Sequence, residues 1–107
     1  MTREEFEKIV VEVLKRLPKI LSEKLINVEI VIEEEPIPQK SLLGLYQGVP
    51  LRRRGIWYGN VLPDKITLFK ANIERLTNNE QETKELVYEV LIHEIGHYFG
   101  FDEEDLL

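Results

Sequence analysis

The residues best placed to do chemistry are two histidines, His93 and His97, and the glutamate that follows the first, Glu94. They form the pattern H-E-x-x-H, and the chain has no other histidine and no cysteine. On a helix the two histidines lie one turn apart on one face, so their ring nitrogens can converge on one metal ion about 2 Å from each. Glu94 is rotated by about 100° and reaches the open side of the metal. The pattern therefore predicts one Zn²⁺ per chain, with Glu94 as the general base that takes a proton from a metal-bound water.

The motif lies in a segment that reads as a largely buried helix over residues 80–99. Apolar side chains cover most of its circumference, and the polar stripe that interrupts them holds Glu89, His93 and His97. Buried polar groups need partners, so the stripe favours a bound ion over two histidines that simply pack in the core. Glu89 has two open interpretations: it either orients a histidine ring from behind or faces solvent.

Both long helices carry end signals. Thr2 with Glu5 predicts a capping box before a helix at residues 3–17, and Asn79 with Glu82 predicts another before the second helix. Gly100 predicts a left-handed residue that ends the second helix.

Gly100 also extends the motif to H-E-x-x-H-x-x-G-x-x-E. A left-handed glycine turns the chain back, so Glu103 is expected to face the same metal as the third ligand. Asp102, Glu104 or a water molecule are the alternatives for that position. Asp102 is otherwise expected to cap a short final turn that runs to Leu107.

At this point the sequence resembles a known family. The run from His93 to Glu103 resembles the extended zinc motif of the minimal zincin-like metallopeptidases, which are small single-domain bacterial proteins. Leu42–Pro50 resembles that family's loop segment, and Leu62–Leu68 resembles the strand that follows it. The resemblance implies a minimal zincin-like fold, zinc-dependent hydrolysis of peptide bonds, and a peptide or protein substrate. The family usually has Asp where this chain has Glu103.

We expect an α+β fold in one domain spanning residues 1–107. A small twisted sheet of three to four strands is expected to pack against the N-terminal helix and the metal-binding helix. The predicted elements are a helix at 3–17, a short helical turn at 20–25, strands at 27–34, 42–46, 56–58 and 65–70, and a helix at 80–99. An extended peptide is expected to add to a sheet edge near residues 66–72.

Composition bounds the function. The chain has 107 residues, 43% hydrophobic and 32% charged, with a net charge of −6. It shows no apolar stretch long enough for a membrane helix and no secretory signal, so we expect a cytoplasmic protein with no membrane partner. The acidic balance disfavours a nucleic-acid partner. Residues 36–75 are net basic, but the run Arg52–Arg54 is more typical of a solvated turn than of a phosphate contact.

Two other functions remain open beside a zinc peptidase. One is a non-catalytic, metal-dependent binding or regulatory module, and the less favoured one is a metal-dependent RNA hydrolase. For a peptidase, Tyr46, Tyr58 and Tyr98 are candidate hydrogen-bond donors to an oxyanion, although each is better explained as a packing residue.

Overall fold

The computed structural model describes residues 1–25, 27–36, 41–49 and 63–101. Within these ranges it has an α+β architecture, which confirms the predicted fold class. The elements are α1 (Arg3–Arg16), α2 (Lys19–Lys24), β1 (Val28–Glu33), β2 (Gly44–Gln47), β3 (Asp64–Phe69), α3 (Lys70–Arg75) and α4 (Glu80–Phe99). The strand predicted at 56–58 lies outside the described residues. Among the described helices, none has the length and apolar character of a membrane span.

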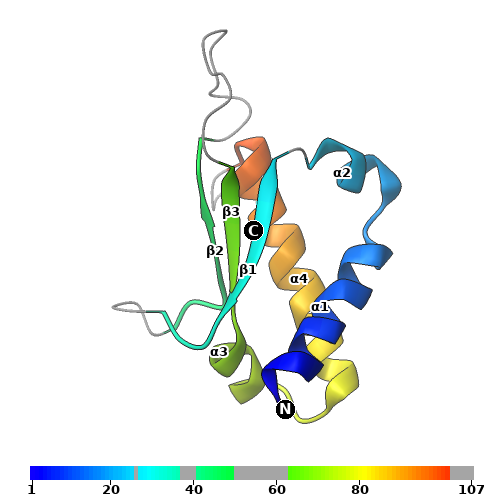
Figure 1. The fold of residues 1–107 in the computed structure, drawn as a ribbon, viewed down its shortest axis with the longest axis vertical. Helices are drawn as coiled ribbons and strands as arrows, with labels where there is room; N and C mark the ends of the chain where they lie inside the picture. Colours follow the sequence, from blue (N-terminus) through cyan, green and yellow to red (C-terminus); the bar gives the residue numbers. More distant parts are fainter. Residues whose placement is uncertain (26, 37–40, 50–62, 102–107) are drawn as a thin grey trace, which may run out of the picture.

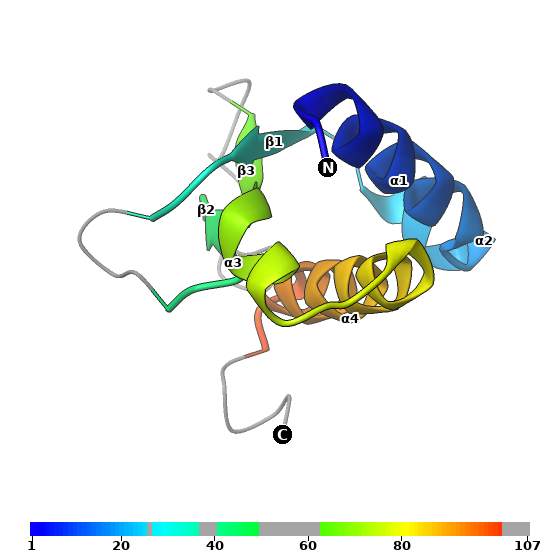
Figure 2. The same cartoon turned by 90° about the horizontal axis from the view of Figure 1, so that it is seen from below.

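The strands form one mixed sheet in the order β1-β3-β2. β1 is parallel to β3, with Ile30 opposite Ile66, while β2 is antiparallel, with Tyr46 opposite the same Ile66. The sheet forms one layer, and α1 and α4 pack side by side on one of its faces (Figures 1 and 2). β3 is thus the central strand. The expectation that a peptide adds near residues 66–72 is wrong, because β3 is paired on both sides and α3 begins directly after it.

A single apolar core fills the space between the layers. Its members come from one face of α1, from β1 and β3, from α3 and from α4, which is why the two long helices need apolar stripes at helical spacing. The largest fully buried aliphatic and aromatic side chains of this core are Phe6, Val13, Ile66, Leu68, Ile73, Val87, Leu91 and Ile95. The C-terminal half of α4 therefore lies against the sheet, which fixes the direction in which its polar stripe points.

The helix ends follow the predicted signals, with one correction. Thr2 and Glu5 form a complete capping box, and the hydrogen bonds from Thr2 hold the pKa of the Glu5 carboxyl below its ordinary value. At α4 the Asn79 side chain accepts a hydrogen bond from the Glu82 N–H at 2.9 Å. The second half of that predicted box is wrong, because the Glu82 carboxylate accepts from the Asn78 N–H instead.

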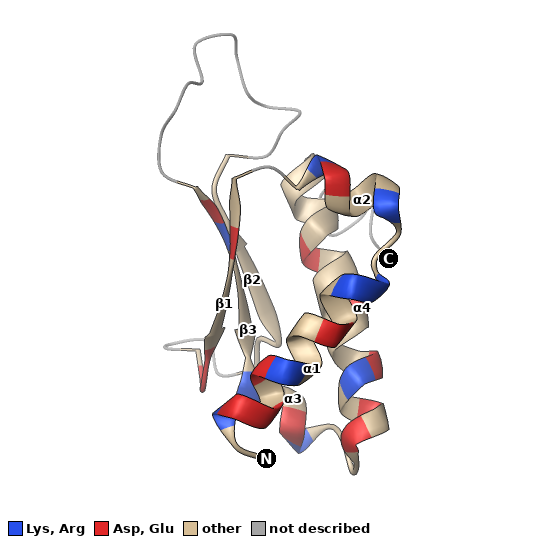
Figure 3. Ribbon diagram, turned by 45° about the vertical axis from the view of Figure 1, so that its right-hand side comes forward, with Lys and Arg blue, Asp and Glu red and all other residues tan. Residues whose placement is uncertain are grey.

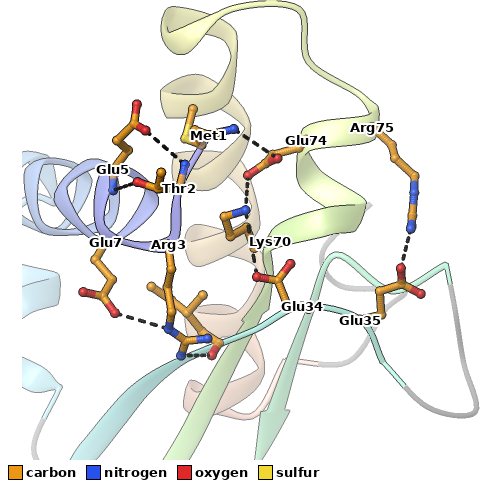
Figure 4. Close-up of polar contacts among 11 residues, drawn as sticks. Met1, Thr2, Arg3, Glu5, Glu7, Glu34, Glu35, Lys70, Glu74 and Arg75 are labelled. Atoms are coloured by element: carbon orange, nitrogen blue, oxygen red, sulfur yellow. Dashed lines mark hydrogen bonds and ion pairs between the residues drawn. The ribbon is translucent and has the colours of Figure 1, made fainter.

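α3 was not expected from the sequence, and a charged network surrounds it (Figure 4). Lys70 is 7% exposed, yet its ammonium group lies 2.8 Å from a Glu74 carboxylate oxygen and 3.9 Å from Glu34. The other Glu74 oxygen lies 3.6 Å from the N-terminal ammonium of Met1. Buried charges are tolerated when they are paired, so this network lets α3 form directly after β3 and joins it to the start of the chain.

Candidate metal site and cleft

His93, Glu94 and His97 lie close together on the part of α4 that faces β2. One potential ligand atom from each of the three side chains lies within 4.8 Å of the others. The imidazole rings of His93 and His97 have centroids 4.9 Å apart and planes at 76°. Both histidines are half-buried, whereas Glu94 is buried at 8% exposure. The three motif residues therefore share one site, and the role of each in it stays a prediction.

The end of α4 orients one of the two imidazoles. Gly100 adopts a left-handed conformation, with φ 103°, as predicted for a helix stop. The chain turns there, and the Phe101 N–H bonds to the Gly96 carbonyl at 3.0 Å. The same turn brings the Phe101 carbonyl oxygen to 2.8 Å from His97 Nδ1. A carbonyl can only accept, so Nδ1 carries the hydrogen and the lone pair of the neutral ring is on Nε2.

This donor set fits a zinc ion. Two nitrogens that each lie about 2.0 Å from one ion are at most about 4 Å apart. The three potential ligand atoms here lie within 4.8 Å of one another, which is close to that limit. A ligating histidine commonly donates its other ring N–H to a backbone carbonyl, as His97 does to Phe101. Two imidazoles and an adjacent carboxylate suit a borderline divalent metal such as zinc better than a hard cation that prefers oxygen ligands alone.

A cleft of about 760 Å³ opens over these residues. Residues 41–46 form one wall, and the other is the face of α4 from Leu86 onward, continued by Gly100 and Phe101. The α4 wall is about 20 Å long at 1.5 Å per helical residue. That length matches about six residues of extended chain at about 3.3 Å each. The shape therefore suits a linear, extended ligand.

Gly44 lets the two walls come close together. A Cβ atom at this position would lie 2.6 Å from Val90 Cγ1 and 3.2 Å from Glu94 Cγ. Contacts that short force a neighbour to move, so only glycine lets the β2 backbone rest on α4 at this point. The first residue of β2 therefore lies directly beside the side chain predicted to act as the base.

Hydrogen bonds from α3 hold the cleft wall in place just before β2. Asn72 is 4% exposed and donates from Nδ2 to the Leu42 carbonyl at 2.7 Å. Arg75 donates to the Asn72 side-chain oxygen and lies 2.6 Å from a Glu35 carboxylate oxygen. The Leu43 carbonyl in turn accepts from the Phe69 N–H at 3.0 Å. These bonds anchor the cleft wall to elements that lie far from it in the sequence.

Two of the three tyrosines considered as oxyanion donors, Tyr46 and Tyr98, have other partners in the structure. The Tyr46 hydroxyl donates to the buried carboxylate of Asp64 at 2.6 Å. Tyr98 is 1% exposed, its ring lies edge-on to Tyr46, and its hydroxyl faces the Lys24 carbonyl at 3.4 Å. These contacts support the packing interpretation for both. Tyr58 and the Arg52–Arg54 run lie outside the described residues.

Of the remaining residues considered for the site, only Glu89 lies within the described part of the chain. Glu103, the expected third ligand, and its alternatives Asp102 and Glu104 lie outside the described residues. Glu89 is exposed and lines the cleft one turn before His93. Within the part of the chain that the structure describes, Glu89 makes no hydrogen bond or ion pair, which favours the solvent-facing interpretation over a bond to a histidine ring.

Sequence reasoning missed two residues that shape the site. The position of Gly44 was not interpreted, although a glycine inside a strand pattern is a recognised signal of close backbone approach. The Phe101 carbonyl was also missed. Its signal was indirect, because a left-handed Gly100 returns the chain toward the last turn of the helix, where His97 lies.

Comparisons with known proteins agree with this geometry. A model of the family described as zincin-like metallopeptidase matches residues 25–107. The fold is similar to that of a solved conserved hypothetical protein from Thermus thermophilus, with 22% identity and a TM-score of 0.63 over 91% of this chain and 92% of the other. No curated protein matches the chain. The extent of the family match shows that this chain belongs to the zincin-like metallopeptidase family.

Proposed function

We propose that this chain is a zinc-dependent hydrolase of peptide bonds. The observation that carries the proposal is the cluster of His93, Glu94 and His97, whose ligand atoms lie within 4.8 Å of one another on the α4 wall of the cleft. A closed structural zinc site has four protein ligands, whereas a catalytic site keeps one position open to solvent or substrate. A cluster that lines a cleft is the arrangement expected of a catalytic zinc site.

Each residue has a definite task in this proposal. When bound between His93 and His97, zinc polarises the carbonyl to be cleaved and lowers the pKa of a water molecule. Glu94 accepts the proton of the attacking water and passes it to the leaving amine nitrogen. The Phe101 carbonyl keeps His97 in the tautomer that presents Nε2. Glu103, one methylene longer than the usual aspartate, is proposed as the third ligand.

The substrate is proposed to lie along β2 rather than beside β3. Among the described strands β2 pairs with β3 alone, so its second edge is available to an extended peptide. At Gly44 the strand itself lies close to Glu94. A peptide that is hydrogen-bonded to the β2 backbone would therefore place its carbonyl groups near His93, Glu94 and His97.

The substitution Glu94→Gln tests the proposal. It keeps the size of the side chain and removes the base, and general-base catalysis contributes about 10²- to 10⁴-fold. Zinc-loaded wild-type protein is expected to cleave a denatured protein or a random peptide library, read by mass spectrometry, at least about 100-fold faster than Glu94→Gln. The matched control is Glu85→Gln, an exposed glutamate on the same helix that does not line the cleft.

Equal cleavage by wild type and Glu94→Gln would contradict the catalytic role of Glu94. If zinc raises the melting temperature of both proteins and neither cleaves any peptide, the metal-dependent binding module is the better description. Wild-type activity that Glu85→Gln keeps and Glu94→Gln loses supports the proposed function.

A further inference from the structure

Glu89 occupies a place in the cleft that the proposed chemistry does not use. It lies four residues before His93 on α4, so the two side chains share one face of the helix. It lines the cleft and is exposed, and no described residue bonds to it. Its carboxylate therefore faces the space that a ligand would fill.

The charged side chains among the described residues that line the cleft are all acidic. Among the described lining residues, Glu89 and Glu94 are the acidic side chains, and none is Lys or Arg. The described strand β2 carries no charged residue, whereas the helices carry both signs (Figure 3). A cleft lined by charge of one sign concentrates its field on the opposite charge. Apart from the zinc ion proposed between His93 and His97, neither described wall offers Glu89 a cationic partner.

The walls beside Glu89 are apolar. Leu86 and Val90 flank it on α4, and Leu42 and Leu43 lie on the opposite wall. Lysine and arginine side chains bury their methylene groups along such surfaces while the charged end reaches a polar group. The arrangement thus suits a long cationic side chain better than a short polar one.

We infer that Glu89 is a specificity-determining residue that selects a lysine or arginine side chain of an extended peptide substrate. The inference rests on the proposed function. Four helical residues separate Glu89 from His93 by about 6 Å along the axis, which equals about two residues of extended chain. The cationic side chain therefore lies about two residues from the bond to be cleaved, on the side toward Leu86.

The test uses the zinc-loaded full chain and a peptide library in which one position at a time is fixed as Lys, norleucine or Glu. Norleucine keeps the methylene stem of lysine without its charge. Wild type is expected to cleave the Lys peptides about fivefold faster than the norleucine peptides at one position, the range of a partly exposed ion pair. Glu89→Gln is expected to lower this preference below about twofold, and Glu89→Lys to shift it toward Glu.

Binding gives a second readout without turnover. Fluorescent Lys and norleucine peptides are titrated against zinc-loaded Glu94→Gln, with and without Glu89→Gln. The same preference is expected in the dissociation constants, and added salt should reduce it. Glu85→Gln and Glu85→Lys change the charge of the same helix outside the cleft and should leave the preference unchanged.

The outcomes separate this inference from the proposed function. A library that is cleaved without any preference for Lys, or a preference that Glu89→Gln keeps, overturns the role of Glu89 and leaves the hydrolase intact. An equal loss of preference in Glu85→Gln also overturns it, because the effect would then belong to the net charge of the helix. A library that wild type neither binds nor cleaves overturns both.

Discussion

Two regions of this molecule, the one near α3 and the cleft, both contain glutamate side chains, but these have different roles in the two places. At the N-terminal end of α1, near α3, every charge of the network around the buried Lys70 has an opposite partner: Lys70 with Glu74 and Glu34, and the Met1 ammonium with Glu74. In the cleft, Glu89 and Glu94 lie beside two imidazoles, and the described walls offer no Lys or Arg. The paired charges near α3 join elements together, whereas the exposed Glu89 lines the cleft and bonds to no described residue.

The two regions also differ in which parts of the sequence supply their side chains. The charges near α3 come from the chain start, the segment after β1, and α3, so their pairing joins distant parts of the sequence. His93, Glu94 and His97 come from one stretch of α4, and the opposite wall contributes a backbone edge and apolar side chains. Substitutions in the first region should therefore change stability, and those in the second should change function.

The largest effect on stability is expected for Lys70→Met. The change leaves Glu74 with the Met1 ammonium alone and removes a buried cation. We expect unfolding to become easier by about 3 kcal/mol, the lower end of the range for breaking a buried pair, because Glu74 is partly exposed. The melting temperature should fall by more than about 10 °C, while zinc binding at low temperature is retained.

Exposed Lys8 provides the control, since Lys8→Met removes a cation from α1 without touching a buried pair. Thermal unfolding followed by circular dichroism gives the comparison. A fall for Lys70→Met no greater than that for Lys8→Met would show that the network near α3 is not what holds this region together.

Gly44→Ala is expected to have a smaller effect on stability than Lys70→Met, and it should also reduce peptide cleavage. The new methyl group has to displace Val90 or the Glu94 side chain. We expect a loss of about 1–2 kcal/mol from overpacking, and a fall in cleavage of about tenfold or more because the base moves relative to the substrate.

A double-mutant cycle with Val90→Ala sharpens this prediction. Val90 Cγ1 is the atom closest to the position that the new methyl group would take, so removing it should recover part of the stability lost by Gly44→Ala. Strictly additive losses would mean that the two walls do not meet at Gly44 as described.

The smallest effect is expected at a partly exposed ion pair between α1 and α4. The Lys84 ammonium lies 2.9 Å from Glu12, and this hydrogen bond lowers the pKa of Glu12 and raises the pKa of Lys84. A lowered Glu12 pKa stabilises the fold above the ordinary glutamate pKa, and that stabilisation is lost as the pH falls through the folded value. A raised Lys84 pKa stabilises below the ordinary lysine pKa and is lost as the pH rises through its own folded value.

Lys84→Met should therefore lower the melting temperature slightly at neutral pH and not at all in acid, once Glu12 is protonated. The difference in melting temperature between wild type and Lys84→Met, measured across the pH range, tests this prediction. A difference that persists unchanged in acid would assign the effect to packing of the lysine stem.

Local signals predicted the parts of the fold that local physics determines. Thr2 and Glu5 cap α1, Asn79 caps α4, and Gly100 ends α4 in a left-handed conformation. The spacing of His93 and His97 required only that the segment be helical, which its apolar residues and end signals indicated. The core of the candidate site was therefore predictable, because its described donors lie within one turn of one helix.

The parts that the sequence did not predict depend on distant partners. α3 has six residues, too few for a periodic pattern, and Lys70 and Asn72 are buried there by contacts with Glu34 and the Leu42 carbonyl. β2 begins two residues later than predicted, at Gly44. The order of the strands, which places β3 at the centre and β2 at the edge, follows from pairings that no local pattern encodes.

The central claim is that two imidazoles of α4 hold one zinc ion in the cleft, and direct measurement of zinc binding to the chelator-treated full chain tests it. Elemental analysis and calorimetric titration should give one zinc per chain for wild type and for Glu89→Gln. His93→Ala and His97→Ala should each lower the affinity by at least about 100-fold, more than the loss of an outer-sphere partner costs. Glu103→Ala should weaken binding more than Asp102→Ala or Glu104→Ala. A folded chain that binds no zinc, or one whose affinity is unchanged by both histidine substitutions, would contradict the account.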